Sequence, residues 1–184
     1  IGLGLKHLSK IKSHNIIVVM DSDGEDDPEQ INKMIDKAKK YPNYVITSNR
    51  TKRKESLLIR FLYRSHLILT FFFTSKWISF GNYSSLDNRN LKYLFKDQSI
   101  WLAYPAAVIK NNNIKILFAA RKKRFYGNSK LTLYKLFFHS LRIISVFYLR
   151  VFLFSLIYIS FLQLFFYHSD KKLFYLLIMP LILK

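Results

Sequence analysis

Five acidic side chains crowd the seven residues that directly follow a short apolar run. The run extends from Ile16 to Met20, and the acids after it are Asp21, Asp23, Glu25, Asp26 and Asp27. Alternate side chains of an extended segment share a face, so Asp21 and Asp23 present two carboxylates on one side. Hard divalent cations such as Mg²⁺ and Mn²⁺ take oxygen ligands and are often shared with substrate phosphates. This spacing predicts a metal-dependent site for a phosphorylated substrate.

The apolar run must position these acids, and its composition indicates how. β-Branched residues without polar alternation are typical of a strand buried on both faces of a parallel α/β sheet. In such sheets ligands bind outside the carboxyl ends of the strands, where the acids fall. Asp27 caps a helix that has Pro28 at its first position, and residues 44–47 form a second strand. Strand, helix and strand make a βαβ-type unit, so the expected fold class is α/β.

The overall charge and composition indicate which kinds of molecule the chain can bind. The 184 residues carry a formal net charge of +19, which favours polyanions such as anionic lipid or phosphorylated metabolites. The chain has no cysteine, which excludes disulfides, zinc–thiolate sites and cysteine catalysis. Its basic residues surround apolar helices and form no recognised RNA-binding module, so nucleic acid is not an expected partner.

A sharp change in composition near residue 131 predicts a domain boundary. Residues 1–130 form the α/β part, and residues 131–184 are predicted to form membrane helices. The 17 uncharged residues from Val151 to Tyr167 predict a span near 145–167, and a second apolar run begins at 173 and is cut by the end of the sequence. Basic residues ahead of the first span place the N-terminal part on the cytoplasmic side.

A further apolar helix is expected between Leu57 and Trp77. Arg60, Arg64 and His66 interrupt it, so it lacks the uncharged length needed to cross a bilayer. It is compatible equally with an amphipathic helix in the membrane interface and with an ordinary helix facing the core.

The acidic residues alone leave several interpretations open. An EF-hand is excluded, because Gly24 is the fourth residue of the motif and Asn32 the twelfth, where calcium loops need glycine sixth and glutamate twelfth. A haloacid-dehalogenase-type phosphatase is similar in its strand followed by Asp-Ser-Asp-Gly, with Asp21 as nucleophile. Against it, Glu25 stands where threonine is usual, and no convincing second acidic pair follows. The Asp-x-Asp motif of nucleotide-sugar enzymes and a merely solvated loop remain as alternatives.

The rest of the chain favours the nucleotide-sugar interpretation. Asp21 to Glu29, DSDGEDDPE, resembles the Asp-x-Asp-x-x-Asp-x-Pro-Glu signature of the family 2 glycosyltransferases that act on polyprenyl phosphates, the dolichol-phosphate-mannose-synthase-like group. Three further segments are similar to that group in the same order along the chain. They are Ser48-Asn49-Arg50 with Arg53-Lys54-Glu55, Phe80 to Arg89, and Arg121 to Lys130 ahead of the apolar helices.

This resemblance implies a GT-A-like nucleotide-sugar domain followed by interfacial and transmembrane α-helices. It implies that Mg²⁺ or Mn²⁺ bridges the donor diphosphate, with Asp21, Asp23 and Glu25 as metal ligands and Asp23 and Asn82 as catalytic residues. It further implies phosphate binding by basic and hydroxyl side chains at Arg50, Arg121, Arg124, Ser129 and Lys130.

Two departures from the family pattern qualify these expectations. Asn82 stands where the family's loop often has an aspartate, and asparagine accepts no proton at neutral pH. A polyprenyl phosphate is already anionic and needs no general base, so transfer by in-line attack survives this change. The family's first strand and nucleotide-base pocket would also precede Ile1, so the sequence is expected to be an N-terminally truncated, partial GT-A domain.

The sequence thus predicts an integral membrane glycosyltransferase with its catalytic domain in the cytoplasm, and a bacterial inner membrane is the expected location. Its expected partners are a nucleotide-sugar donor, undecaprenyl or dolichyl phosphate as the polyprenyl acceptor, membrane lipid and a second copy of the chain. Two alternatives are a non-enzymatic, membrane-associated remnant of such an enzyme and the phosphatase that uses Asp21.

Overall fold

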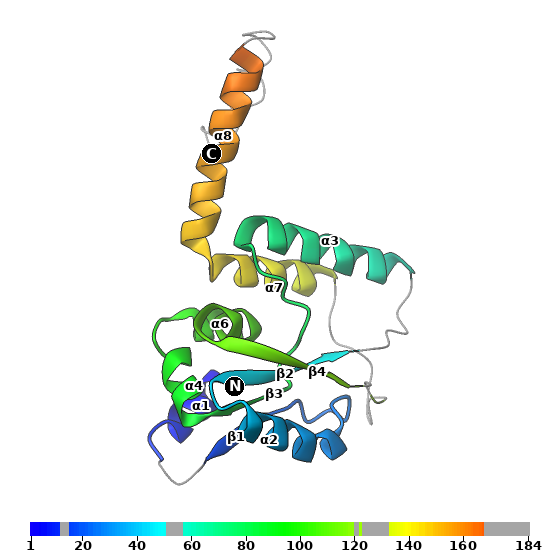
Figure 1. The fold of residues 1–184 in the computed structure, drawn as a ribbon. Coiled ribbons are helices and arrows are strands. Elements are labelled where there is room, and N and C mark those ends of the chain that lie inside the picture. The colour runs from blue at the N-terminus through cyan, green and yellow to red at the C-terminus, as the bar shows by residue number, and fades with distance from the viewer. Residues whose placement is uncertain (12–14, 51–56, 120–121, 123–132, 168–184) are drawn as a thin grey trace. The chain divides into compact units, whose positions relative to one another are not determined.

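The computed structural model describes residues 1–11, 15–50, 57–119, 122 and 133–167 (Figure 1). The chain divides into two compact units, of which the first ends at Phe147 and the second begins at Tyr148. In chain order the elements are α1 (Gly2–Leu8), β1 (Ile16–Val19), the 3₁₀ helix η1 (Pro28–Gln30), α2 (Ile31–Lys40), β2 (Tyr44–Arg50), α3 (Leu57–Thr74), β3 (Ser84–Asp87), α4 (Asn88–Leu94), α5 (Ser99–Leu102), α6 (Tyr104–Asn111), β4 (Asn113–Ala119), α7 (Leu133–Ser145) and α8 (Tyr148–Tyr167).

A four-stranded mixed sheet forms the centre of the first unit, in the order β1-β3-β2-β4. β3 is antiparallel to both β1 and β2, and β2 is parallel to β4. β1, β2 and β4 therefore all run in one direction, which confirms the predicted α/β class. Because the strands share a direction, the segments that follow them leave the sheet at the same edge. We call this the carboxyl edge.

β3 lies within residues 80–89, a segment whose polar composition is typical of a loop. Ser84 and Ser85 are almost fully buried, and each has a partner for its hydroxyl. The Ser85 hydroxyl donates to the backbone carbonyl of Met34 at 3.0 Å, and the Ser84 hydroxyl lies 2.6 Å from that of Tyr104. Two buried residues of β3 are therefore polar, so a search for runs of apolar residues does not predict this strand.

The position of β3 also changes the expected environment of β1. β3 lies between β1 and β2, so the two strands predicted to form a βαβ unit are not neighbours. β1 pairs with β3 and, among the described residues, with no other strand. Of its four residues only Ile17 is buried, and the others are half-buried. The expectation of a strand buried on both faces was therefore wrong within the described structure.

Helices cover both faces of the sheet. α2 packs on β1, β2 and β3, and its buried residues Met34 and Ala38 face the sheet. Neighbouring residues of a strand point to opposite faces, so Val45 and Ile46 serve different layers. Val45 joins the main hydrophobic cluster, to which α4, α5, α6 and the end of α7 contribute. This core fixes the strands whose ends carry the polar residues described below.

α3 and α7 pack against each other beside this core (Figure 1). α3 confirms the helix expected after Leu57, and it keeps large apolar side chains exposed, with Phe61 67%, Ile68 62% and Phe72 57% accessible. α7 does the same with Tyr134 and Phe137. α7 lies in the first unit, although the sequence assigned residues 131–184 to the membrane part. The division into catalytic and membrane domains stays a prediction.

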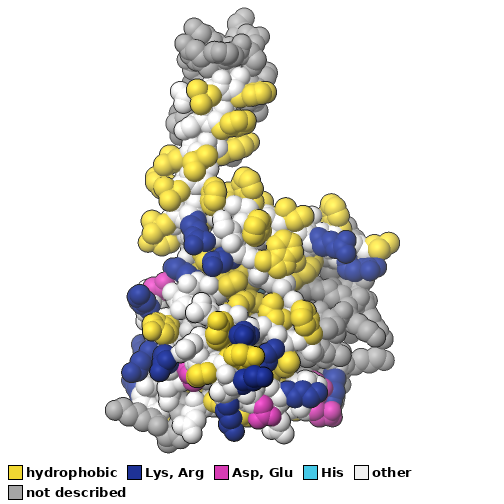
Figure 2. All heavy atoms as spheres, viewed as in Figure 1, with side chains coloured by type: hydrophobic (Ala, Val, Ile, Leu, Met, Phe, Trp, Pro, Cys, Tyr) yellow, Lys and Arg dark blue, Asp and Glu magenta, His cyan; other side chains and the backbone are white. Residues whose placement is uncertain are grey.

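The second unit contains α8, a long apolar helix. Residues Tyr148–Phe165 have a mean hydropathy of 1.7, and none of this stretch is buried within the structure. On the face that Figure 2 shows, hydrophobic side chains line α8. At 1.5 Å per residue the 20 residues of α8 extend about 30 Å, so the helix is long enough to cross a membrane. The second predicted span, from residue 173, lies outside the described residues.

Candidate functional site

The segment from Asp21 to Glu29, which we call the acidic loop, begins at the carboxyl edge where β1 ends. Gly24 within it is buried and has φ of 83°, a left-handed conformation that glycine adopts at little cost. The loop's carboxylates bind its own backbone: Asp26 Oδ2 accepts from the Asp21 N–H at 2.9 Å, and Asp23 Oδ1 accepts from the Glu25 N–H at 3.0 Å. These bonds hold the acids in a defined arrangement.

Asn82 lies directly beside the acidic loop. Its Nδ2 donates to Asp21 Oδ1 at 3.1 Å, across 61 residues of sequence. The segment that carries Asn82 leads into β3, whose Ser84 pairs with Val19 at the end of β1. The structure thus brings together two of the residues predicted for the site. An amide donor can orient the Asp21 carboxylate but cannot take up a proton from a substrate.

The expected metal ligands were tested against this arrangement. Among the described residues, no group of three or more histidine, aspartate or glutamate side chains is placed to hold a metal ion. Mg²⁺, however, is usually held by one or two carboxylates together with substrate phosphates rather than by an all-protein cage. Asp21 and Asp23 are half-buried oxygen donors of this kind. The loop's chemistry fits a divalent cation, and the ligand set Asp21, Asp23 and Glu25 stays a prediction.

Lys122 is a site residue that the sequence analysis missed. Its Nζ lies 2.8 Å from Asp27 Oδ1 and 3.1 Å from Glu29 Oε1, and its backbone N–H donates to the Glu25 carbonyl at 3.0 Å. Glu29 is largely exposed, whereas the Asp27 side chain is only 11% accessible, so the Asp27 contact is the better shielded of the two. The segment after β4 is thereby tied to the acidic loop. The clue in the sequence was its place in a basic run, for which phosphate binding alone was expected.

Asp27 anchors the end of the acidic loop through both its side chain and its backbone. Its Oδ1 caps the following helix by accepting from the Glu29 N–H at 3.0 Å, as the sequence predicted. The hydrogen bond from Lys122 lowers the pKa of the Asp27 carboxyl below its usual value, and it raises that of the lysine. The Tyr83 hydroxyl donates to the Asp27 carbonyl at 2.8 Å. Burial, with the nearby Asp26 and Asp27, raises the pKa of Tyr83 to about 12, so this hydroxyl remains a donor at neutral pH.

The predicted phosphate-binding residues fall in two groups. Arg50 ends β2 and pairs in register with Ala119 at the end of β4, so its backbone lies at the carboxyl edge. Arg121, Arg124, Ser129 and Lys130 lie outside the described residues. Lys122 stands between Arg121 and Arg124 in the sequence, and it is the residue of this run that the structure describes, in contact with the acids.

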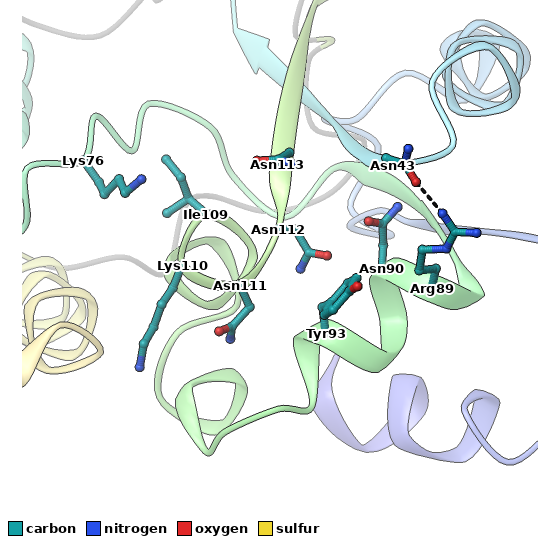
Figure 3. A pocket seen from close by; sticks show the side chains of 10 residues that line it. All are labelled: Asn43, Lys76, Arg89, Asn90, Tyr93, Ile109, Lys110, Asn111, Asn112 and Asn113. Carbon is teal, nitrogen blue, oxygen red and sulfur yellow. Dashed lines mark hydrogen bonds between the residues drawn. The ribbon is translucent and has the colours of Figure 1, made fainter.

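A cavity of about 500 Å³ lies elsewhere, among Asn43, Arg89 and Asn112 at the opposite edge of the sheet (Figure 3). It contains none of the predicted site residues. Chemistry rather than hollow volume therefore identifies the acidic loop as the candidate site, because carboxylates, an orienting amide and a cation converge there.

Comparison with known proteins shows the family of this part of the chain. The family model described as Glycosyl transferase family 2 matches residues 4–106, which include the acidic loop and Asn82 and cover more than half of the chain. No match was found among the curated proteins.

Proposed function

The chain belongs to glycosyl transferase family 2, and from this membership we propose that it transfers a sugar from a nucleotide-sugar donor to a polyprenyl phosphate at the cytoplasmic face of a membrane. The observation that carries the proposal is that the segments with the predicted site residues come together at the carboxyl edge. The acidic loop after β1, Asn82 ahead of β3, and the ends of β2 and β4 all meet there. The mixed four-stranded sheet is consistent with part of a GT-A fold.

On the donor side, the acidic loop positions carboxylates for a diphosphate. A bound Mg²⁺ or Mn²⁺ would neutralise the diphosphate and the charge that develops on the leaving group. The chain's own contribution is orientation. Asn82 fixes the Asp21 carboxylate, and the Glu25 N–H fixes that of Asp23, so neither acid has to reorganise when a cation and phosphates arrive.

On the acceptor side, a phosphate oxygen needs no deprotonation before it attacks. This supports a mechanism in which Asn82 orients and no residue acts as a general base. Arg50, Arg121, Arg124, Ser129 and Lys130 are proposed to hold the phosphates of donor or acceptor. Guanidinium forks suit phosphate oxygens in particular. The contact of Lys122 with Asp27 supports this by bringing the start of that basic segment to the acids.

Three helices support association with a membrane: α3 and α7 in the first unit and α8 in the second. α3 and α7 expose large aromatic and aliphatic side chains, a surface that lipid would cover at low cost. α8 has the length and composition of a membrane span. Arg60, Arg64 and Arg142 on α3 and α7 add positive charge, which anionic headgroups attract.

Sugar transfer by the purified full chain tests the proposal directly. The protein in detergent is incubated with Mn²⁺, undecaprenyl phosphate and a panel of radiolabelled nucleotide sugars, and extraction measures labelled lipid. We expect transfer from at least one donor. Asp23→Asn should lower it about 100-fold or more, because one preorganised electrostatic group is removed.

Asp36→Asn is the matched control, since Asp36 is an exposed carboxylate on α2, away from the loop. Transfer by Asp23→Asn at the wild-type rate would contradict the proposal. Release of phosphate from a generic phosphate ester, lost in Asp21→Asn, would replace it with the phosphatase. Absence of both activities together with absence of Mn²⁺ binding would leave the remnant interpretation.

A further inference from the structure

The cavity at the opposite edge of the sheet has an unusual lining (Figure 3). Five asparagines, three basic residues, one tyrosine and one isoleucine surround a volume of about 500 Å³, and no carboxylate is among them. Small-molecule sites commonly measure roughly 300–1,000 Å³, and the volume of this cavity falls within that range. Most such sites are apolar, so this lining indicates a polar, hydrogen-bonding occupant.

The cavity is separate from the acidic loop. It lies where β2 and β4 begin, since Asn43 precedes β2 and Asn113 opens β4 opposite Tyr44. The acidic loop lies at the other end of the same sheet. A strand as long as the seven residues of β2 separates the two edges by about 20 Å. A molecule in the cavity is therefore not the group that reacts at the acidic loop.

Asn112 supplies the most specific sign of a ligand. Both Oδ1 and Nδ2 of its side chain are buried, and neither has a hydrogen-bond partner within the described structure. Figure 3 shows this amide in the middle of the lining, between Asn111 and Asn90. Burying an amide without partners destabilises the folded chain. Because both atoms are enclosed, the amide must rotate toward the cavity to meet a ligand, where one ligand hydroxyl can donate to Oδ1 and a neighbouring one can accept from Nδ2.

The charge of the lining indicates an anion. Arg89 donates to the uncharged Asn43 Oδ1 at 2.6 Å, a contact that leaves its positive charge uncompensated. Lys110 is paired with Asp97 at 2.7 Å, so its charge is neutralised. The half-buried Lys76 side chain makes no ion pair with any described carboxylate. Arg89 and Lys76 thus carry charge that no described carboxylate neutralises, and they lie at opposite ends of the lining (Figure 3), so Arg89 is the cation expected to contact the anionic group and Lys76 adds attraction from the far end.

We propose that this cavity is a second ligand site, for a small polyhydroxylated anion of the sugar-phosphate class. Arg89 and Lys76 supply the charge that attracts the anionic group, and the Asn112 amide pairs with a hydroxyl. The proposal stands whether or not the acidic loop transfers a sugar, because it rests on residues at the other edge of the sheet.

Calorimetric titration of the purified full chain with glucose 6-phosphate tests the proposal. Glucose and inorganic phosphate are the comparison probes, and each should bind about tenfold or more weakly because each lacks half of the contacts. Asn112→Ala and Arg89→Gln should each weaken binding of glucose 6-phosphate about tenfold, the usual loss for one hydrogen bond to a charged or buried group.

Two variants serve as controls. Lys92→Gln removes the same charge from an exposed position on the same helix, α4, outside the lining, and should leave binding unchanged. Asp23→Asn should also leave it unchanged, and loss of binding there would place glucose 6-phosphate at the acidic loop and overturn the proposal. Absence of binding, or equal affinity for inorganic phosphate, would overturn it as well.

The melting temperature of the unliganded variants adds a test that is independent of affinity. Removing an amide that lacks partners should leave the Tm of Asn112→Ala equal to or above that of the wild type. A clearly lower Tm would mean that the amide has a structural partner in the folded chain, and it would count against a ligand site.

Discussion

The two edges of the sheet treat polar side chains in opposite ways. At the carboxyl edge, Asp21, Asp23 and Asp27 all bind named groups: an amide, a backbone N–H and a lysine. At the other edge, both amide atoms of Asn112 are enclosed and have no partner among the described residues. Composition differs as well, because acids gather at the first edge and amides with cations at the second.

This difference separates two strategies for a binding surface. Groups that already bind each other are held in place before a ligand arrives, and a ligand gains from their fixed geometry. Groups without partners carry a cost that only a ligand or solvent removes. Substitutions at the carboxyl edge are therefore expected to act by changing the geometry and charge of the preformed contacts. Substitutions at the opposite edge are expected to act by changing how well a ligand binds in the cavity.

The largest effect is expected when charge is added to the carboxyl edge. Asn82→Asp places a second carboxylate where the amide now lies 3.1 Å from Asp21 Oδ1. Repulsion at this separation should lower the free energy of unfolding by about 1–4 kcal/mol in chelator, and Mn²⁺ should recover most of the loss. Thermal unfolding with and without Mn²⁺ measures both quantities.

Asn82→Ser is the control, since it removes the amide without adding charge. Its loss of stability should not respond to Mn²⁺. An equal metal response in the two variants would mean that the carboxylates at this edge do not share a cation.

A backbone change at the same edge should have the next largest effect. Gly24→Ala forces a side chain into φ of 83°, at a cost of about 1–2 kcal/mol. Gly4→Ala is the matched control, because Gly4 is exposed within α1 and an added Cβ meets no atom within 4 Å. This control should stabilise the chain by about 0.5–1 kcal/mol. Denaturant unfolding of the pair measures the difference, and equal effects would contradict the strained loop.

A threonine pair tests whether a missing partner matters in itself. Thr47 and Thr74 are both fully buried, but Thr47 Oγ1 has no partner among the described residues. Thr74 Oγ1 donates to the Thr70 carbonyl at 2.6 Å and accepts from the Lys76 N–H at 3.2 Å. Thr74→Val should cost about 1 kcal/mol, whereas Thr47→Val should be neutral or stabilising. Chemical denaturation compares them, and equal costs would remove the basis for the distinction between the edges.

The smallest effect concerns pH at the carboxyl edge. The pKa of Asp27 is lowered in the folded chain from 3.8, with Lys122 as the main cause, so the unfolded chain binds this proton first as pH falls. The stability from this contact is complete above about pH 5, declines as pH falls through the unfolded value and is lost below the folded pKa. The free energy of unfolding of Lys122→Gln should therefore fall less steeply than that of the wild type between pH 5 and pH 3, as measured by denaturation followed by circular dichroism. An unchanged acid profile would mean that the ion pair does not contribute in solution.

The sequence predicts those parts of the fold that apolar patterns specify. The strands near 16–20 and 44–47 and the helix after Asp27 were predicted from runs of apolar residues and a capping residue. The acidic loop was expected at the carboxyl ends of the strands, where the structure has it, and Arg50 at the end of β2 lies at the same edge. The proximity of Asn82 to Asp21 was expected only through family resemblance.

Other features depend on partners that no local pattern reveals. β3 is a strand because Met34 and Tyr104 accept or share its serine hydroxyls, and both are distant in sequence. The residues of α5 and α6 received no assignment, since their short apolar stretches show no clear period. The role of Lys122 depends on a contact across 93 residues, and the cavity depends on asparagines from three separate segments. Tertiary structure, rather than composition, creates these features.

The contact between Lys122 and Glu29 also determines when the candidate site can be assembled during synthesis of the chain. At about 5–20 residues per second, the 93 residues between them take roughly 5–20 s to add. Throughout that interval the acidic loop exists without its lysine, and β2 exists without β4. The carboxyl edge is therefore completed late in translation, immediately before α7 and α8 are made.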